Sequence, residues 1–368
     1  MTHCDVLIVG AGPAGAVAAL NLASTRQVMV VDRRIAPVAR IGESLPPAAR
    51  RLLTDMGLWD DFLLQGHAAC YGNRSLWDGL NAEHDFLRDP DGQGWHLDRA
   101  QFESWLQAHA VASGATLLTS TTLDSVKAIK GGWQVTLDTA TGSTEVQAKV
   151  LIDASGRAAT LGRKLGARRR HHEPLVCLWL YGHDQHSAVD SRSQIEAVEH
   201  GWWYTASLPG QRRVLAFHTD SDLPNVAIAR ALRSPTALLN AAKVTMEISP
   251  QLDAAGFVAD AEIATTAAHS ATLQPVSGDR WCAAGDAAIS FDPLSSQGLF
   301  NAMYTGLAAA LACDRRLSGE VVAFDDYGND LRRVETAYRR HLDFWYGQEK
   351  RWPDSPFWQR RQAKGNDE

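Results

Sequence analysis

Hydrophobic and polar positions in the first 32 residues follow an order that predicts strand, helix and strand. Residues 5–9 form a short apolar run, residues 16–23 have the pattern of a helix, and residues 28–31 form a second apolar run. Gly-Ala-Gly-Pro-Ala-Gly separates the first strand from the helix, and Asp32 ends the second strand. This order predicts a dinucleotide site, because the glycines let the backbone approach a pyrophosphate at the helix N-terminus.

The pattern continues with elements of both kinds. Residues 48–56 and 100–112 have the period of amphipathic helices. Residues 123–129 and 133–137 read as two strands joined by a Gly-Gly turn. A further strand, residues 146–152, runs into the turn sequence Asp-Ala-Ser-Gly-Arg. Ligands of open α/β sheets lie at such carboxyl ends, so we expect this turn to lie near the nucleotide.

From residue 170 the chain becomes richer in short strands. The apolar runs predict antiparallel strands at residues 175–180, 194–198, 202–209 and 213–218, and the pattern returns to helix over residues 226–250. Trp202 and Trp203 place aromatic rings on both faces of one predicted strand. Two interpretations stay open: these rings are the wall of a site, or they are plain sheet core.

A second candidate site motif lies near residue 290. Residues 281–284 form a strand of small side chains that ends at Gly285-Asp286, and the turn Asp-Pro-Leu-Ser-Ser-Gln-Gly occupies residues 292–298. A helix is predicted from residue 299 to residue 311. A carboxylate placed here can bind ribose or ribityl hydroxyls, and the backbone N–H groups of the turn can stabilise negative charge.

Composition narrows the class of protein. The chain has 368 residues, of which 45% are hydrophobic, so it can bury a large core, and we expect two lobes. Its net charge of −6 provides no basic surface for nucleic acid. No apolar run reaches the ~20 residues of a membrane span, and no signal peptide is recognisable. These patterns predict a cytoplasmic protein without nucleic acid or membrane partners.

Cysteine and histidine patterns give no metal site. The five cysteines are scattered and lack C-x-x-C spacing, which suits buried thiols in a reducing compartment. His171, His172 and Glu173 are consecutive, but adjacent side chains in a strand point to opposite faces. We therefore expect an exposed polar turn there and no metal.

Taken together, these motifs resemble a known family. Gly-Ala-Gly-Pro-Ala-Gly with Asp32, Trp-His-Leu-Asp-Arg ending at Arg99, Asp-Ala-Ser-Gly-Arg ending at Arg157, and the two motifs around residue 290 are similar to two-domain FAD oxidoreductases of the para-hydroxybenzoate-hydroxylase superfamily. Gly-Glu-Ser-Leu-Pro at residues 42–46 resembles the branch of tryptophan halogenases and geranylgeranyl reductases. The tryptophan-rich C-terminal motif at residues 349–358 resembles the LodB/GoxB-type and QhpG-type flavoproteins of tryptophylquinone biogenesis.

The resemblance implies an α/β fold. We expect a Rossmann-like FAD-binding domain with a parallel sheet of the GR2 type, an inserted and mainly antiparallel β-sheet substrate domain, and a C-terminal helical segment. The implied ranges are residues 1–66, 95–169 and 271–320 for the FAD-binding domain, 67–94 and 170–270 for the substrate domain, and 321–368 for the helical segment. A second G-x-G-x-x-G is missing after residue 150, so no separate NAD(P)H domain is expected.

Roles in binding FAD carry over to matching positions. The three glycines of the loop would hold the pyrophosphate. Asp32 would bind the adenosine ribose, and Asp286 would bind the ribityl or pyrophosphate region. The implied cofactor-binding residues are Gly10, Gly12, Pro13, Ala14, Gly15, Asp32, Arg33, Arg40, Glu43, Ser44, Arg99, Asp153, Gly285, Asp286, Pro293, Gly298 and Leu299.

The resemblance also implies an oxygenase activity. An FAD-dependent monooxygenase would form a flavin C4a-hydroperoxide and hydroxylate an electron-rich ring, such as a free indole or a tryptophan of a precursor protein. Electrons would come from NAD(P)H docking transiently or from a partner reductase. The candidate catalytic residues are Pro293, Ser295, Ser296, Gln297, Gly298, Trp203 and His96, with Asp292 and Tyr71 also on the substrate side.

Departures from the family pattern separate the alternatives. Halogenases carry a lysine before an early tryptophan, but this chain has no lysine between Gly66 and Arg99, and Ser295 stands where halogenases have a glutamate. Halogenation is therefore disfavoured. A geranylgeranyl-reductase-like enzyme would need an apolar tunnel, whereas the second lobe is rich in Trp, His and Arg. A non-catalytic FAD-binding assembly partner stays open, because it would need the same FAD site.

Basic residues could serve a protein partner. Arg163 and Lys164 with Arg168, Arg169 and Arg170 form the candidate docking cluster. The alternative is an ordinary solvated run of charge, because long charged side chains usually remain in water.

Overall fold

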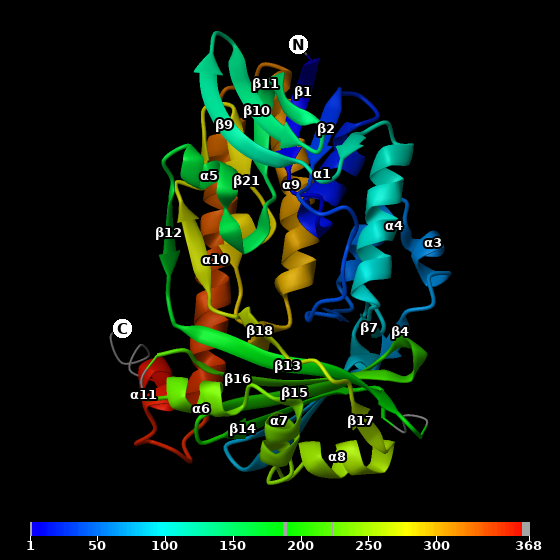
Figure 1. The fold of residues 1–368 in the computed structure, drawn as a ribbon, viewed down its shortest axis with the longest axis vertical. Coiled ribbons are helices and arrows are strands. Elements are labelled where there is room, and N and C mark those ends of the chain that lie inside the picture. Colours follow the sequence, from blue (N-terminus) through cyan, green and yellow to red (C-terminus); the bar gives the residue numbers. More distant parts are fainter. Residues whose placement is uncertain (1, 187–189, 223, 363–368) are drawn as a thin grey trace.

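The computed structural model describes residues 2–186, 190–222 and 224–362. The last six residues of the expected C-terminal segment, 363–368, lie outside this part of the chain. Figure 1 shows two sheets, one in the upper half of the view and one in the lower half, with helices around the upper sheet and below the lower one. The expected α/β class is therefore confirmed.

The upper sheet has eight strands and a parallel centre. Its path runs through β20 (Ser277–Gly278), β21 (Trp281–Ala283), β11 (Gly142–Asp153), β1 (Thr2–Val9), β2 (Val28–Val31) and β8 (Thr116–Leu118), with β10 (Gly132–Thr139) and β9 (Thr122–Ile129) added beside β11. The pairs of β1 with β2 and β11, of β2 with β8, and of β11 with β21 are parallel. Parallel strands share one carboxyl edge, and the motifs found in the sequence end there.

Helices pack closely on the upper sheet. Helix α1 (Pro13–Leu22) lies against α9 (Gly298–Leu317), and a Cβ added to Gly306 would lie 2.4 Å from the Ala14 carbonyl oxygen. The small residues of both helices therefore allow the backbones to approach. The remaining helices of this half are α2 (Ala49–Asp55), α3 (Trp59–Leu63), α4 (Arg99–Ala112) and α5 (Thr160–Lys164).

The lower sheet also has eight strands and is mainly antiparallel. Its path runs through β17 (Phe257–Ala259), β13 (Leu175–Asp184), β16 (Arg212–Asp220), β15 (Gly201–Leu208), β14 (Ser193–Val198), β5 (Gly72–Trp77) and β6 (Leu80–Asp85), with β18 (Ala264–Ala267) beside β13. Only the pair of β14 and β5 is parallel among the described strands of this sheet.

The helical region expected over residues 226–250 contains three short helices. They are α6 (Val226–Ala231), α7 (Pro235–Ala242) and α8 (Ile248–Ala255), and their apolar residues pack on the lower sheet. The break before α7 has a clear cause, because the Ser234 hydroxyl caps the new helix and Pro235 occupies its first turn.

Small sheets form where the chain enters and leaves the lower sheet. One contains β3 (Ser44–Leu45), β7 (Gly94–His96) and β4 (Ala68–Cys70), and the other contains β12 (Arg168–His171), β19 (Ala271–Gln274) and β22 (Ile289–Ser290). Single 3-10 turns occur at Phe86–Arg88, Gly156–Ala158, Pro209–Gln211, Gly285–Ala287 and Pro293–Ser295. The positions of these small sheets support the division into an FAD-binding and a substrate domain, which we keep as a proposal.

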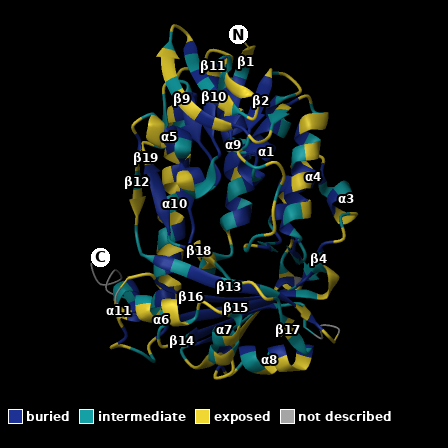
Figure 2. Ribbon diagram, viewed as in Figure 1, coloured by how far each residue is buried: buried dark blue, intermediate teal, exposed yellow. Residues whose placement is uncertain are grey.

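The C-terminal helices connect the two halves. Helix α10 (Ala323–Gln348) runs from the upper sheet down to the lower one, and α11 (Pro356–Gln362) follows beside it (Figure 1). The Tyr327 hydroxyl donates to the Ala283 carbonyl at 2.7 Å, whereas the Tyr346 oxygen accepts from the Trp202 indole at 3.1 Å. Figure 2 shows that the central strands of both sheets are mostly buried, whereas strands away from the centre, such as β9, are largely exposed. No helix among the described residues is long and apolar enough to cross a membrane.

Candidate functional site

A cavity of about 730 Å³ extends from the carboxyl edge of the upper sheet to one face of the lower sheet. This volume is in the range of about 300–1,000 Å³ that small-molecule sites occupy. The N-termini of two helices, α1 and α9, lie on it, through Gly12 and Pro13 in the first case and Gly298 and Leu299 in the second. Helix N-termini offer unpaired N–H groups and favour negative charge.

The glycine loop leaves room for a ligand at one position only. A Cβ on Gly10 would lie 2.3 Å from the Ala154 carbonyl oxygen, and one on Gly15 would lie 1.9 Å from the Gly10 carbonyl oxygen. A Cβ on Gly12 would meet nothing nearer than the Arg40 Nη2 atom, at 3.7 Å. Gly10 and Gly15 therefore serve the packing of the loop, and Gly12 exposes backbone to the cavity.

Asp32 braces the same loop. Its Oδ2 atom accepts from the Ala11 amide and its Oδ1 atom from the Arg34 amide, both at 2.8 Å. Asp32 also lines the cavity. Each carboxylate oxygen has more than one lone pair, so the side chain can hold the loop and still accept from a ribose hydroxyl.

Two arginines share one carboxylate beside the loop. The Glu103 Oε1 atom accepts from Arg40 Nη2 and from Arg99 Nη2, each at 2.5 Å, and Arg99 also donates to the Gly42 carbonyl. Burial acts to raise the pKa of Glu103, but the charges of Arg99 and Arg40 lower it below the ordinary value. These two guanidinium groups and one carboxylate together carry a net positive charge, and the Arg40 Nη2 atom lies next to Gly12. This arrangement suits an anionic pyrophosphate.

Arginines also fix the loop around Asp286. The Arg157 Nε atom lies 3.5 Å from an Asp286 carboxylate oxygen, and both residues line the cavity. Arg169 donates to the Asp286 carbonyl at 2.8 Å and to the Ser290 hydroxyl at 2.7 Å. Arg169, from the candidate docking cluster, is thus engaged inside the fold and holds the cavity wall.

A buried carboxylate lies at the junction of the two sheets. Glu43 is 1% exposed; its Oε1 atom accepts from the Tyr181 hydroxyl at 2.5 Å and its Oε2 atom from the Gly42 amide at 2.8 Å. Burial raises the pKa of Glu43 above the ordinary value, and the bond from Tyr181 opposes that rise. Tyr181 comes from β13, so this bond ties the lower sheet to the loop before β3.

Aromatic side chains of the lower sheet form the far wall. Trp202 of β15, Tyr204 two residues on, and His218 of β16 line the cavity, together with Cys177 of β13. The Trp202 and His218 rings are stacked with centroids 3.6 Å apart and planes 7° apart. Burial lowers the pKa of His218 to about 3, so its imidazole is neutral in ordinary buffers and offers one donor and one acceptor nitrogen.

Many of the residues expected at the site do line the cavity. They are Gly10, Gly12, Pro13, Ala14, Asp32, Arg33, Arg40, Glu43, Ser44, Arg99, Asp286, Pro293, Ser296, Gly298 and Leu299. These residues are separated by up to several hundred positions in sequence, and the structure brings them around one space. Their roles toward FAD are part of the proposal below.

The other expected residues do not line the cavity; they are Gly15, Tyr71, His96, Asp153, Trp203, Gly285, Ser295 and Gln297. Trp203 points to the opposite face of β15, where it packs with Phe217 against the short helices. His96 is buried and its Nε2 atom lies 2.9 Å from the Ser193 hydroxyl. Asp153 accepts from the Ser155 hydroxyl and the Gly162 amide, so it shapes the turn.

Sequence reasoning missed several site residues. Glu103 lies four positions after Arg99 in α4, a spacing that puts both side chains on one face and was the available signal. His218 and Tyr346 carried no such local signal, because their partners are distant in sequence. All five cysteines are buried and free. Among the residues that the structure describes, no cluster of His, Cys, Asp or Glu could hold a metal ion.

Comparison with known proteins identifies the family of this chain. Residues 3–340 match the family model described as FAD binding domain. The chain is 31% identical over 374 residues to the putative FAD-dependent oxidoreductase LodB of Marinomonas mediterranea, covering 99% of this chain and 98% of LodB.

Solved structures share the fold. The myxobacterial chondrochloren halogenase CndH matches with a TM-score of 0.89 at 22% identity, over 100% of this chain and 88% of CndH. The peptidyl tryptophan dihydroxylase QhpG, described as essential for tryptophylquinone cofactor biogenesis, matches with a TM-score of 0.72 at 24% identity, over 98% of this chain and 79% of QhpG.

The glycine loop fits this family on structural grounds, because it leaves open at Gly12 the space that a bound dinucleotide needs. The expected cofactor, FAD, is confirmed by the family match. The chain belongs to the FAD binding domain family and is an FAD-dependent oxidoreductase.

Proposed function

We propose that this protein is a monooxygenase that hydroxylates the indole ring of a tryptophan residue carried by a partner protein, as a step in the maturation of a tryptophylquinone cofactor. The observation that carries the proposal is the continuity of one cavity. It begins at the glycine loop and ends at the wall formed by Trp202, Tyr204 and His218. A ring held against that wall would lie in the same enclosed space as the flavin.

Bound FAD, once reduced, supplies the activated oxygen, and this chain supplies position and enclosure. Arg40 and the backbone at Gly12 would hold the pyrophosphate, with Asp32 and Asp286 placed for the hydroxyls of ribose and ribityl. Pro293 and Gly298 would face the flavin ring. The buried aromatic wall excludes water from the reacting ring, and stacking on Trp202 or Tyr204 fixes its plane.

Relatives support the choice of substrate. LodB, named a putative FAD-dependent oxidoreductase, aligns with nearly the whole chain, and QhpG, which shares the fold, is described as a dihydroxylase of peptidyl tryptophan. An electron donor is required because each oxygenation consumes two electrons. We propose NAD(P)H, docking transiently at the cavity, or a partner reductase.

Halogenation is the second candidate, favoured by the fold similarity to CndH. The cavity lining argues against it. No lysine occurs among the described residues that line the cavity, and Ser295 bonds back to the Asp292 carbonyl at 2.8 Å. A lysine ammonium to steer an electrophilic halogen is thus missing from the described lining, and the Ser295 hydroxyl has no negative charge to replace a glutamate.

The test is direct oxygenation by the FAD-loaded protein. The protein would be reduced with NADH, NADPH or light, then mixed with oxygenated buffer and a tryptophan-containing peptide or a free indole, with and without bromide. Mass spectrometry should show oxygen added to the peptide tryptophan. Free FAD without protein is the control.

Each alternative has its own result. A brominated product would support a halogenase. Reduction of an isoprenoid quinone or prenyl chain without oxygen uptake would support a reductase. Neither oxygenation nor substrate-stimulated oxygen uptake with any aromatic compound would overturn the proposal and favour a binding role.

A further inference from the structure

Three side chains from distant parts of the chain form one hydrogen-bonded line beside the cavity. The Trp202 Nε1–H donates to the Tyr346 oxygen at 3.1 Å, and the Tyr346 hydroxyl donates to the Asp292 Oδ2 atom at 2.8 Å. Trp202 and Asp292 both line the cavity, whereas Tyr346 lies behind them in α10. The line therefore begins and ends in the wall of the cavity.

Asp292 is held rigidly. Its other carboxylate oxygen accepts from the Leu294 amide at 2.9 Å, and its own amide donates to the Tyr338 oxygen at 2.7 Å. The ring of Tyr338 stacks on Phe291 with centroids 4.0 Å apart. Tyr338 and Tyr346 are eight residues apart in α10, so they lie on the same face of that helix. Asp292 itself is fully buried.

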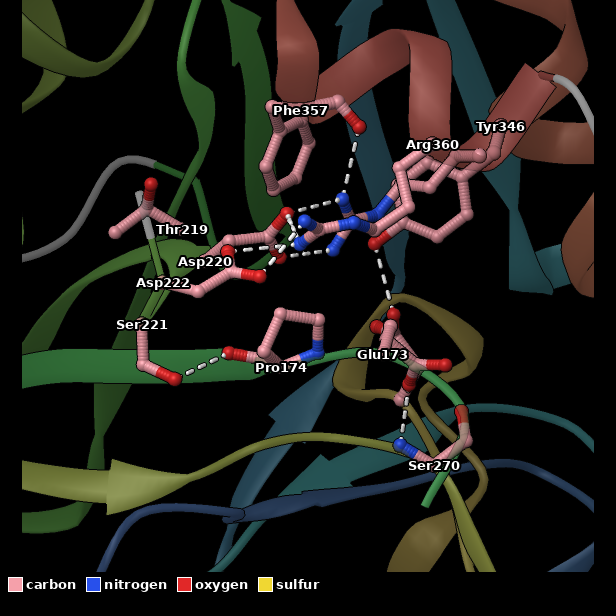
Figure 3. Close-up of polar contacts among 12 residues, drawn as sticks. Glu173, Pro174, Thr219, Asp220, Ser221, Asp222, Ser270, Tyr346, Phe357 and Arg360 are labelled. Carbon is pink, nitrogen blue, oxygen red and sulfur yellow. Dashed lines mark hydrogen bonds and ion pairs between the residues drawn. The ribbon is translucent and has the colours of Figure 1, made fainter. Parts of the chain in front are cut away.

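Charged groups surround this line on its far side. Glu173, which precedes β13, and Arg361 of α11 both act on the charge of Asp292. The Arg361 guanidinium lies 5.0 Å from the centre of the Tyr346 ring and bonds the Asp220 carboxylate at 2.7 Å. Figure 3 shows this surrounding group, with Asp220 and Arg360 near Phe357 and with Glu173 bonded to the Ser270 amide.

We propose that Asp292 is the proton acceptor of the oxygenation step, with Tyr346 and Trp202 as the positioning residues that hold its carboxylate. The inference rests on the proposed function. In the step, a C–O bond forms at the ring carbon, the C–H bond of that carbon breaks, and its electron pair returns to the ring. The proton goes to the Asp292 carboxylate. Dioxygen supplies the oxygen atom, and the reduced flavin supplies two electrons. The O–O bond breaks and the second oxygen leaves as water, with the protons for the water and the new hydroxyl taken from the reduced flavin and the medium.

The ionisation of Asp292 suits this role. Burial and the charge of Glu173 raise the pKa of Asp292 to about 7, and the Leu294 amide, Arg361 and Tyr346 limit the rise. A base with a pKa near the working pH is about half ionised, so it can accept a proton and give it up again after each turnover.

The protonation of Tyr346 also explains why its hydroxyl suits a bond to the Asp292 carboxylate. Burial raises the pKa of the Tyr346 hydroxyl far above its usual value, so it stays protonated and can only donate toward Asp292. The bond from Trp202 occupies the Tyr346 oxygen and fixes the direction of that hydroxyl. The carboxylate is thereby kept in one orientation.

Asp292→Asn is the first test, performed on the FAD-loaded protein. Asparagine has the same shape and its oxygen can still accept from the Leu294 amide, so FAD content and melting temperature should stay close to those of the parent. Loss of a general base should lower the hydroxylation rate by about 10²–10⁴. It should also remove the step near pH 7 from the rate profile.

The second test needs no turnover. Infrared spectra recorded across pH should show a carboxylic acid that ionises near pH 7 in the parent and is missing in Asp292→Asn. Tyr346→Phe removes a bond that lowers the pKa, so the same band should titrate at higher pH. Glu173→Gln removes a charge that raises the pKa, so it should titrate at lower pH. Tyr327→Phe, a buried tyrosine of α10 bonded to the Ala283 carbonyl, is the matched control and should cause no shift.

The outcomes separate the two proposals. Parallel shifts of the infrared band and of the rate profile, in opposite directions for the two variants, would support the role of Asp292. Hydroxylation that continues in Asp292→Asn at the parent rate would overturn that role and leave the monooxygenase intact. Failure of the parent protein to oxygenate any aromatic substrate would overturn both, whatever the infrared band shows.

Discussion

The indole of Trp202 lies flat on the imidazole of His218, with the two planes only 7° from parallel. These residues face each other across β15 and β16, where they are partners in register. Both side chains line the end of the cavity. The next residue of β15, Trp203, faces the other way, so one strand builds both the site wall and the core behind it.

Replacing Trp202 and Trp203 one at a time by phenylalanine should separate the role in the cavity wall from the role in the core. Trp203→Phe removes contacts with Phe217 and should lower the free energy of unfolding by roughly 1–3 kcal/mol without changing KM. Trp202→Phe loses the bond to Tyr346 and part of the stack on His218, so it should change KM and kcat in addition to lowering stability. Urea denaturation and steady-state kinetics measure both. Equal effects of the two variants on kinetics would contradict the assignment.

Gly12→Val should weaken FAD retention at least tenfold while leaving the fold intact. The added side chain enters open space beside Arg40, and it would occupy the position of a bound pyrophosphate. We expect a loss of FAD affinity above about 1.4 kcal/mol, a factor of ten in Kd. Gly15→Ala is the contrasting variant, because its Cβ would strike the Gly10 carbonyl and should unfold the loop. Flavin absorbance per protein and thermal melting report the two effects, and normal flavin content in Gly12→Val would reject the placement.

Arg40→Ala should weaken FAD binding by about 1.5–3 kcal/mol, the size of a charge-assisted hydrogen bond. The salt dependence of Kd should flatten at the same time, because one charge contact is lost. Arg50→Ala is the matched control, since Arg50 lies over the Trp59 ring and away from the cavity. Fluorescence titration of the apoprotein with FAD at several salt concentrations gives these values. Identical behaviour of the two variants would contradict a role for Arg40.

Acid should destabilise the protein through its buried histidines. Burial lowers the pKa of His218 to about 3 and that of His96 to about 4, both below the ordinary 6.5. As pH falls below 6.5, the unfolded chain binds protons that the folded chain cannot, so stability is lost progressively down to the folded pKa. His218→Gln should therefore flatten the fall in unfolding free energy between pH 6.5 and about 4.

The parent protein must be measured beside the variant because Asp292 changes the free energy of unfolding with pH in the opposite direction. Its raised pKa means that the folded state gains protons first as pH falls from about 7. Urea denaturation of both proteins at matched pH values isolates the contribution of His218. Parallel curves would show that His218 accepts a proton in the folded state.

Arg360 and Arg361 should differ in their effect on stability. Both bond Asp220, but the Arg361 side chain is 5% exposed and the Arg360 side chain 30%. Arg361→Met breaks a buried pair and should cost about 3–5 kcal/mol. Arg360→Ala should cost within about 1 kcal/mol, as exposed pairs do. Equal losses in urea denaturation would contradict the difference in burial.

Local sequence patterns predicted the part of the site that lies at the carboxyl edge of the upper sheet. The spacing of the glycines, the acid at the end of β2 and the turn at residues 292–298 each need only neighbouring residues to be recognised, and the structure places them around one cavity. The alternation of a strand also predicted that Trp202 and Trp203 would diverge. Which of them faces the cavity depended on the sheet and helices packed on each side, so it could not be read from the strand alone.

Contacts between distant residues account for what sequence could not show. Asp292 and Tyr346 are 54 positions apart, and Trp202 and Tyr346 are 144 positions apart. Nothing in a single sequence specifies that the end of α10 reaches the lower sheet. His96 illustrates the converse: its motif is conspicuous, but its ring is buried against Ser193 and outside the cavity lining.

Tyr346 and Arg361 lie far in sequence from the glycine loop. A variant without α10 and α11 would keep the residues of that loop, but would lose the groups that hold Asp292 and bond Trp202. The two ends of the cavity therefore depend on different segments of the chain.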